Sequence, residues 1–413
     1  IDEAKFLAAG LRKLTGTHLV LYTDLPASAE VDSLPAVFDA AVPQWAEYFD
    51  VPEDVYADWS MIGFVIADKE KFRALGVLPE SLPAFANGYS IGKVLWMYDQ
   101  PSDYYRRHLL LHEGVHGFMR FLYGDCGPPW YEEGMAELLA THRYDAGRLE
   151  VNYVPRSRDE APMWGRVRIL REAFADHRAL DWEDVLNLGP TAHREVDAYG
   201  WSWAACLLLE KDPRFHERFR RVPKLLEYGD FFNGFNQMFA DDWDAIRRQW
   251  RLMVAMFDYG YDVAKEAVDG TPGRPLPAEG AEIVVSAEHG WQNSGYRLEA
   301  GKTYRVTAAG RYTIAADPRP WPCEPNGVTV RYFQGYPLGI LLAGIYDDDT
   351  SPEGLWNPVP VGLEQTLVVQ RPGTLFFRVN DSPAEWGDNQ GELRVRVTPV
   401  VRNGTPPAAS QNP

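Results

Sequence analysis

The sequence predicts a multidomain α+β protein, and three observations carry this prediction. Short strands alternate with helices over residues 1–103. Apolar residues then recur every three or four positions over 104–263, and every second position over 282–402. We therefore expect an N-terminal α/β unit, a helical domain and an antiparallel β-sandwich, with a linker at 264–281 and a flexible tail at 403–413.

The N-terminal unit is expected to contain two buried strands with a helix between them. Residues 17–25 and 60–68 are rich in β-branched and aromatic residues, which is typical of buried strands. Residues 34–51 place Ala, Phe, Val and Trp on one side at helical spacing. This order of strand, helix and strand indicates a small α/β unit.

The middle of the chain is expected to be helical. Residues 104–124 repeat apolar residues at helical spacing and end at a glycine, Gly124. A second helix over 130–144 follows Pro128 and Pro129, a pair suited to a helix start. Further helices are expected at 163–177, 199–212 and 243–257.

The C-terminal part is expected to be all β. A stretch dense in Gly and Pro at 268–280 favours a linker. Beyond it, apolar and polar residues alternate in segments that are separated by turns, which is typical of an antiparallel sandwich. These segments are 281–287, 302–310, 374–380 and 392–400.

Composition and charge exclude several classes of protein. The formal net charge is −18, and no run of Lys or Arg forms a basic stripe, so we do not expect nucleic acid as a partner. No apolar run approaches the roughly 20 residues of a transmembrane helix, so no transmembrane segment is expected. Cys126, Cys206 and Cys323 are too few and too scattered for a disulfide framework or a four-cysteine zinc site.

The strongest functional motif is His-Glu-Gly-Val-His at 112–116, an H-E-x-x-H on a predicted helix. His112 and His116 are four residues apart and share a helical face, from which two imidazoles can bind one zinc ion. Glu113 lies beside the first histidine, where a carboxylate can act as general base on a water molecule. The motif predicts a zinc site with Glu113 as its catalytic base.

A catalytic zinc ion needs a third protein ligand, and the next helix supplies Glu132, Glu133 and Glu137. Glu133 and Glu137 are four residues apart and share a face, whereas Glu132 points elsewhere. His108, one turn before His112, is expected to lie behind the ligands or to be a partly buried polar group. Direct ligation or substrate contact by His108 is the alternative.

The motifs H-E-x-x-H and W-x-x-E-G-x-A-E resemble the gluzincin metallopeptidases, in particular the aminopeptidase-N-like and peptidase MA-like branch. The resemblance covers about residues 15–260. It implies a helical zincin domain and a zinc-dependent peptidase acting on peptides or proteins. It also implies that Glu133 is the third zinc ligand and that Glu137 orients a histidine. The interval from His116 to Glu133 is a couple of residues shorter than is usual in the aminopeptidases.

The same resemblance suggests a tyrosine on a later helix that stabilises the oxyanion of the reaction, and Tyr199 is the candidate. A tyrosine that packs against the core at the start of a helix is an equally good interpretation of Tyr199. No G-x-M-E-N segment, which in aminopeptidases holds the free N-terminus of the substrate, precedes the zinc motif. We therefore expect an endopeptidase or a specialised peptidase.

Residues 375–397 resemble the calcium site of the bacterial galactose-binding lectin family, and the resemblance extends over most of 282–399. It implies a galactose-binding-like sandwich that binds calcium and, through it, a carbohydrate or glycoprotein. It further implies a secreted or extracytoplasmic location in the bacterial envelope. A turn rich in Asp and Asn that only closes a hairpin is the alternative. The implied calcium ligands are the side chains of Asp381, Asp388 and Asn389 and the backbone carbonyl of Glu385.

Two further hypotheses remain open at this point. In the first, the chain is a carbohydrate-binding protein whose peptidase-like domain is inactive. Intact His112, Glu113, His116 and Glu133 argue against it, because decayed sites usually lose the catalytic Glu or a ligand. In the second, the zinc site hydrolyses an amide other than a peptide bond.

Overall fold

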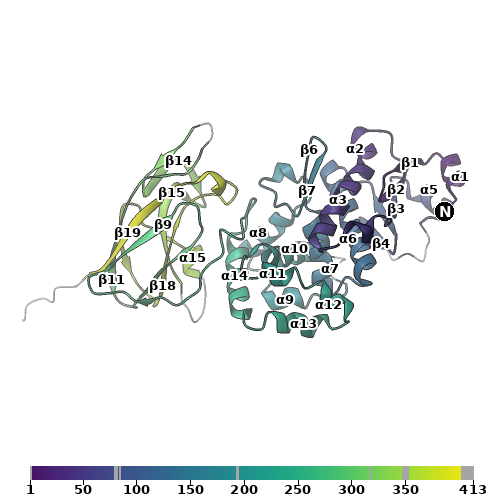
Figure 1. Cartoon of the computed structure of the whole chain (residues 1–413). Helices are drawn as coiled ribbons and strands as arrows, with labels where there is room; N and C mark the ends of the chain where they lie inside the picture. Colours follow the sequence, from purple (N-terminus) through teal and green to yellow (C-terminus); the bar gives the residue numbers. More distant parts are fainter. Residues whose placement is uncertain are drawn as a thin grey trace, which may run out of the picture. The chain divides into compact units, whose positions relative to one another are not determined.

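A computed structural model describes residues 2–78, 82, 85–191, 195–316, 319–346 and 353–400. The chain divides into two compact units, Ile1–Ala264 and Lys265–Pro413, of which the first mixes helices and sheet and the second is rich in strands (Figure 1). The protein is therefore a multidomain chain of mixed α and β structure. The predicted flexible tail at 403–413 lies outside the described residues.

The first unit contains a five-stranded sheet with the order β1-β2-β3-β5-β4. The inner strands β2, β3 and β5 run parallel, and the edge strands β1 and β4 are antiparallel to their neighbours. The strands predicted at 17–25 and 60–68 are confirmed as β2 and β3. The bounds are β1 (Arg12–Thr15), β2 (Leu19–Thr23), β3 (Met61–Ile66), β4 (Gly88–Ile91) and β5 (Val94–Tyr98).

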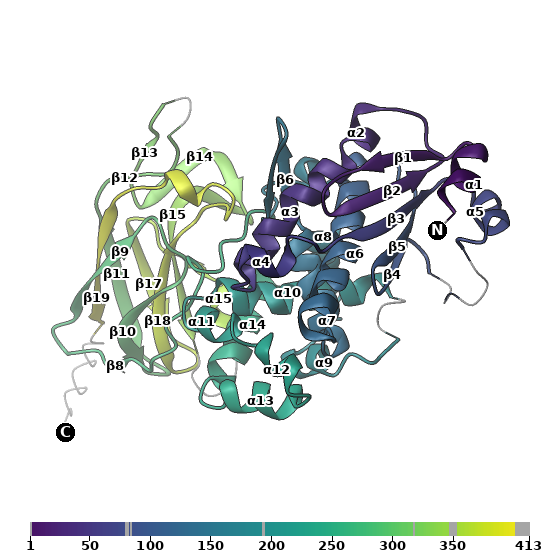
Figure 2. The ribbon, with the colours of Figure 1, turned by 45° about the vertical axis from the view of Figure 1, so that its right-hand side comes forward.

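Two long helices, α3 (Leu34–Tyr48) and α6 (Asp103–Tyr123), pack against each other and against the sheet (Figure 2). Their close approach depends on Gly114, because a Cβ there would lie 2.5 Å from the ring of Phe38. The helix predicted at 104–124 is confirmed as α6, and Gly124 ends it in the left-handed conformation that glycine adopts readily. The shorter helices around the sheet are α1 (Glu3–Ala8), α2 (Ala29–Asp32), α4 (Glu53–Tyr56) and α5 (Lys69–Leu75).

The rest of the first unit is mostly helical. The helix predicted at 130–144 is correct only to residue 140, because Thr141 is extended and a β-hairpin follows, with positive φ at Ala146 and Gly147 in its turn. The helices predicted at 163–177, 199–212 and 243–257 are confirmed as α8, α10 and α14. The elements are α7 (Pro129–Ala140), β6 (His142–Asp145), β7 (Arg148–Val151), η1 (Arg158–Glu160), α8 (Arg166–Ala175), α9 (Trp182–Leu186), α10 (Val196–Lys211), α11 (His216–Phe219), α12 (Lys224–Glu227), α13 (Phe231–Met238) and α14 (Trp243–Met256).

The second unit is built from two facing, mainly antiparallel sheets. Their common hydrophobic core contains buried residues of both, among them Val306 and Val395 of one sheet and Leu341 and Phe377 of the other. In one sheet the order is β14-β15-β18-β10-β8, with β16 beside β15, and in the other it is β17-β11-β19-β9. The bounds are β8 (Arg274–Pro275), β9 (Ala281–Ser286), β10 (Gln292–Leu298), β11 (Thr303–Ala309), β12 (Tyr312–Thr313), β13 (Pro322–Cys323), β14 (Asn326–Phe333), β15 (Tyr336–Tyr346), α15 (Glu353–Trp356), β16 (Val359–Pro360), β17 (Glu364–Val368), β18 (Gly373–Val379), η3 (Trp386–Asp388) and β19 (Glu392–Pro399).

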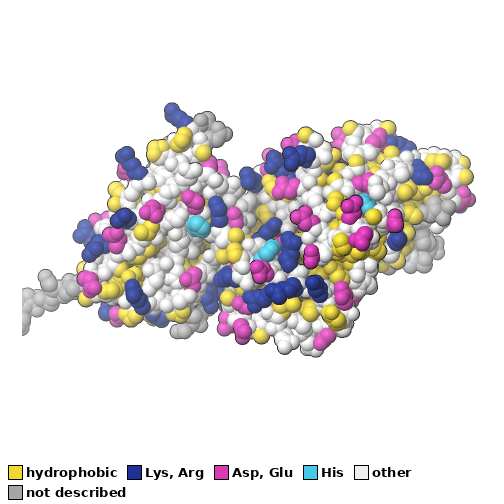
Figure 3. All heavy atoms as spheres, viewed as in Figure 1, with side chains coloured by type: hydrophobic (Ala, Val, Ile, Leu, Met, Phe, Trp, Pro, Cys, Tyr) yellow, Lys and Arg dark blue, Asp and Glu magenta, His cyan; other side chains and the backbone are white. Residues whose placement is uncertain are grey.

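The stretch 264–281, predicted as a linker, is largely part of the second unit. Its strand β8 pairs in parallel with β10, and the Lys265 Nζ donates to the Trp386 carbonyl at 3.1 Å. Gly and Pro therefore mark an irregular edge of the sheet here. None of the described helices has the length and apolar character needed to span a bilayer. On the face drawn in Figure 3, basic side chains lie among acidic ones in both units.

Candidate functional site

Helix α6 carries the H-E-x-x-H motif in its middle. The helix begins at a Ser102 cap, whose Oγ accepts a hydrogen bond from the Tyr105 N–H at 3.3 Å. Two turns further along, His112 and His116 project side by side, with 3.1 Å between their Nε2 atoms. Both imidazoles and Glu113 are buried, with at most 6% of each residue exposed. The helix thus holds two imidazole nitrogens, of a kind that can bind a metal, in a site largely closed to solvent.

Helix α7 brings Glu133 to these two histidines. Its Oε2 lies 3.2 Å from His112 Nε2 and 3.5 Å from His116 Nε2. Burial opposes ionisation of this carboxyl, yet the two imidazoles hold the pKa of Glu133 below its usual range. The same Oε2 is buried and makes no hydrogen bond within the described part of the chain.

The geometry of this triad fits a tetrahedral zinc ion. Ligand atoms bound to zinc at about 2.0–2.1 Å in a tetrahedral arrangement lie about 3.3–3.4 Å from one another. The observed separations among His112, His116 and Glu133 are 3.1, 3.2 and 3.5 Å. Two imidazoles and a carboxylate also form a donor set typical of catalytic zinc, with one position left for water or substrate.

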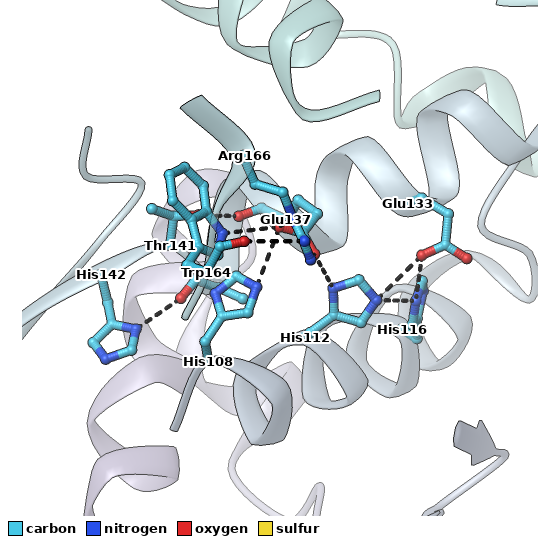
Figure 4. A network of polar contacts seen from close by, with 10 residues as sticks. His108, His112, His116, Glu133, Glu137, Thr141, His142, Trp164 and Arg166 are labelled. Carbon is cyan, nitrogen blue, oxygen red and sulfur yellow. Dashed lines mark hydrogen bonds and ion pairs between the residues drawn. The ribbon is translucent and has the colours of Figure 1, made fainter. Parts of the chain in front are cut away.

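Glu137, the competing candidate for third ligand, is occupied elsewhere (Figure 4). Its Oε1 lies 3.3 Å from His112 Nδ1, and its Oε2 lies 3.2 Å from His108 Nε2. Arg166 donates to both oxygens at 2.8 and 3.0 Å, and the Trp164 indole N–H donates to Oε2 at 3.1 Å. Burial would raise the pKa of Glu137, but the Arg166 guanidinium with His108 and His112 holds it well below its usual range.

These contacts place Glu137 and His108 behind the candidate ligands His112, His116 and Glu133. A carboxylate at His112 Nδ1 favours the tautomer that carries its proton on Nδ1 and presents the Nε2 lone pair to a metal. His108 reaches Glu137 and lies outside the triad. Trp164 and Arg166 were not predicted from the sequence, because they follow Glu137 by 27 and 29 residues, respectively, and belong to no local motif.

The structure brings the edge strand β4 beside Glu113. A Cβ on Gly88 would lie only 2.7 Å from Glu113 Oε1, so the strand backbone is close to the carboxylate. Burial raises the pKa of Glu113, while the neighbouring His112 and His116 and the nearby Ser90 hydroxyl oppose this rise. Gly88 and Ser90 were not identified from the sequence, since nothing in residues 88–91 marks their position in space.

Tyr199 lies in the first turns of α10, next to the triad. Its ring centre is 5.7 Å from that of His112, and the Arg166 guanidinium lies 5.3 Å from the Tyr199 ring on its face. Burial raises the pKa of Tyr199, and the negative charges of Glu133 and Glu113 raise it further. The tyrosine is therefore within electrostatic reach of both carboxylates of the site.

In the second unit, the side-chain oxygens that are buried without a hydrogen bond in the described residues include Asp381 Oδ2, Asp388 Oδ1 and Asn389 Oδ1. Asp381 follows β18 closely and is fully buried, and burial together with the charges of Glu385 and Asp388 raises its pKa to about 7. Carboxylate and amide oxygens of this kind are the ligands that a hard cation such as calcium prefers.

Backbone contacts fix the orientation of this oxygen cluster. The Ala316 N–H donates to Asp388 Oδ2 at 2.9 Å, and the Ser382 N–H donates to Asp381 Oδ1 at 2.7 Å. The Asn389 amide donates to the Ala287 carbonyl at 3.1 Å. In each side chain one polar atom is thus hydrogen-bonded, and the remaining oxygen makes no hydrogen bond within the described residues. The Glu385 carbonyl accepts a hydrogen bond from the Asp388 N–H at 3.4 Å.

Similarity to known proteins was found among solved structures alone. No protein-family profile matches the chain, and neither does any curated protein. Among solved structures, the N-terminal domain of EclA, a PllA-like lectin, is similar at 22% identity and a TM-score of 0.23, over 29% of this chain and 95% of that domain. PliG of Aeromonas hydrophila, a periplasmic inhibitor of g-type lysozyme, is similar at 11% identity and a TM-score of 0.19, over 31% of this chain and 96% of PliG. At TM-scores this low, neither similarity identifies the function of this chain.

Proposed function

We propose that the first unit is a zinc-dependent peptidase whose metal is held by His112, His116 and Glu133. The observation that carries this proposal is the separation of the three ligand atoms, which matches a tetrahedral zinc ion. A bound zinc ion would supply a Lewis acid that polarises the scissile carbonyl and lowers the pKa of a water molecule. The other parts of the reaction would come from the chain itself.

Glu113 would be the general base. Its carboxylate would accept a proton from the attacking water and deliver it to the leaving amine. The Tyr199 hydroxyl would donate a hydrogen bond to the oxyanion that develops on the substrate carbonyl. Both roles are supported by the position of these residues beside the triad.

Strand β4 favours a peptide as the substrate over another amide. It is the last strand of its sheet, so one of its edges has no neighbouring strand among the described residues. An extended peptide can add to such an edge through main-chain hydrogen bonds. Gly88 on this strand lies against Glu113, and a peptide bound along β4 would therefore pass close to the catalytic base.

Metal analysis and peptide cleavage test this proposal together. The purified wild-type chain should contain zinc, and His112→Ala should contain one zinc ion fewer per chain. Glu113→Gln should retain the zinc and lose cleavage of a peptide library. Absence of zinc from the zinc-supplied wild type would contradict the metal site. Zinc without any cleavage that depends on Glu113 would instead favour a carbohydrate-binding protein with an inactive peptidase-like domain.

A second function is favoured by the buried oxygens of the second unit. We propose that Asp381, Asp388 and Asn389 bind calcium and that the sandwich, resembling the galactose-binding lectins, binds a carbohydrate or glycoprotein through it. Calcium is plentiful outside the cytoplasm, so the proposal implies an extracytoplasmic location. Calorimetry should detect calcium binding that Asp381→Asn abolishes, followed by calcium-dependent retention on a galactose matrix. Equal calcium binding by both proteins would contradict the site.

A further inference from the structure

His116 has a second nitrogen that the proposed zinc site does not use. With Nε2 directed at Glu133, Nδ1 is buried and makes no hydrogen bond within the described part of the chain. An imidazole that binds a metal through one nitrogen almost always donates its other N–H to a carboxylate, a carbonyl or water. His116 Nδ1 therefore lacks a partner that such a ligand ordinarily has.

Two metal-binding side chains flank this nitrogen. Glu132 Oε1 lies 3.7 Å from His116 Nδ1, and Cys126 is almost fully buried with its thiol donating to the His116 carbonyl at 3.6 Å. The ligand atoms of His116, Cys126 and Glu132 all lie within 4.8 Å of one another. A nitrogen, a sulfur and an oxygen donor thus lie close enough together to be drawn onto one ion.

We infer that His116 Nδ1, Cys126 Sγ and Glu132 form a second site, for a soft divalent cation, that shares the His116 imidazole with the proposed zinc site. Thiolate and imidazole together select zinc or cadmium over calcium and magnesium. Occupation of the site would release the proton of the Cys126 thiol, and a neutral His116 would bind through Nδ1 with its own proton on Nε2. If the zinc site were filled as well, His116 would also lose that proton and bridge the two ions as an imidazolate. The inference concerns metal binding alone and does not require peptidase activity.

The surroundings allow an ion to enter and the ligands to close on it. The Glu132 side chain is 26% exposed and connects the cluster to solvent. Glu132 is held by Arg120 at 2.5 Å, and the Arg120 side chain is itself 35% exposed. Tetrahedral nitrogen and oxygen ligands of zinc are about 3.3 Å apart, so the carboxylate has to move only a few tenths of an ångström toward His116.

A cadmium titration tests the inference directly. The full chain, freed of metal and held in excess calcium to fill oxygen-only sites, is titrated with cadmium while the ultraviolet absorption of a cadmium–thiolate bond is recorded. The wild type should develop this band, and Cys126→Ser should lose it, because serine keeps the hydrogen bond to the His116 carbonyl but offers no thiolate. Cys206→Ser, a change at another buried cysteine of the same unit, should retain the band. A wild type without the band, or an equal band in Cys126→Ser, would overturn the site.

Two further variants keep the result interpretable. His112→Ala removes the proposed zinc site and should leave the thiolate band in place, so the two proposals can fail independently. Glu132→Gln changes a partly exposed side chain and should weaken cadmium binding while the band at saturation remains. Unchanged cadmium affinity in Glu132→Gln would remove Glu132 from the site, and loss of the band in His112→Ala would assign the thiolate signal to the first site.

Discussion

The Arg166 guanidinium forms a two-pronged hydrogen bond with the Glu137 carboxylate, at 2.8 and 3.0 Å, in an environment where both side chains are almost completely buried. The same carboxylate contacts His112 Nδ1 at 3.3 Å. Arg166 therefore acts on the proposed metal centre through Glu137 and His112. It keeps the Glu137 carboxylate ionised and fixed, and this carboxylate contacts His112. Removing the partner of a buried charge is costly because the remaining charge is left uncompensated.

We expect Arg166→Lys to weaken zinc binding about 10–100-fold, the usual effect of disturbing a group behind a metal ligand. Lysine keeps the positive charge but cannot donate two parallel hydrogen bonds to one carboxylate. Competition with a chelator would measure the zinc affinity. Arg168→Lys, at an exposed position of the same helix, should leave the affinity unchanged. Equal affinities for all three proteins would remove Glu137 from the control of the metal.

Tyr199→Phe should lower kcat for peptide cleavage about 100-fold, in the range observed when an oxyanion donor is removed. The ring contact with His112 would persist, so zinc content should not change. Tyr228→Phe, at a tyrosine that is 77% exposed, serves as the matched control. A loss of zinc in Tyr199→Phe would instead indicate that this tyrosine supports the metal ligands.

Gly88→Ala should displace the proposed base. The new Cβ would lie 2.7 Å from Glu113 Oε1 and 2.9 Å from Leu109 Cδ1, so the carboxylate has to shift. A displacement of a catalytic group by about 1 Å can cost up to about 100-fold in rate. Steady-state kinetics should therefore show a lower kcat at normal zinc content. Gly189→Ala, where no atom lies within 4 Å of the new Cβ, should behave as wild type, and full activity in Gly88→Ala would contradict the role of Glu113.

His142 should make folding stability depend on pH. The Arg107 Nε–H donates to His142 Nε2 at 3.3 Å, and His142 Nδ1 donates to the Ala140 carbonyl at 2.8 Å, so the imidazole is held neutral. Burial lowers the pKa of His142 from 6.5 to about 3. Between these values the unfolded chain binds the proton and the folded chain does not. The contribution of His142 is thus complete above pH 6.5 and is lost as the pH falls toward 3.

The expected loss is at most about 1.4 kcal/mol of unfolding free energy per pH unit over this window. Urea unfolding of the wild type and of His142→Asn at several pH values would measure it. The stability difference between the two proteins should shrink as the pH falls from 6.5. A difference that stays constant down to pH 4 would show that His142 is not held neutral in the folded chain.

The sequence was most informative where function depends on local spacing. Four-residue spacing on a helix was enough to place His112 and His116 on one face. The choice of Glu133 over Glu137 came from the resemblance to the gluzincins, in which the Glu before Gly is the ligand. The contacts of Arg166 and Gly88 depend on segments brought together only by packing, and no pattern of apolar residues encodes them. The helix expected at 130–144 was predicted four residues too long. Apolar periodicity does not reveal that Thr141 adopts an extended backbone conformation and ends the helix at Ala140.

Gly134, the residue after Glu133, faces the contact between α7 and α10 and not the proposed zinc site. A Cβ there would lie 2.5 Å from both the Ser202 carbonyl and Cys206 Sγ, so the two helices touch through their backbones. The close packing of α7 against α10 therefore helps to determine the distance between Glu133 and the two histidines. Substitutions at positions 134, 202 and 206 would then change the size of ion that the proposed site accepts, although none of these residues is a ligand.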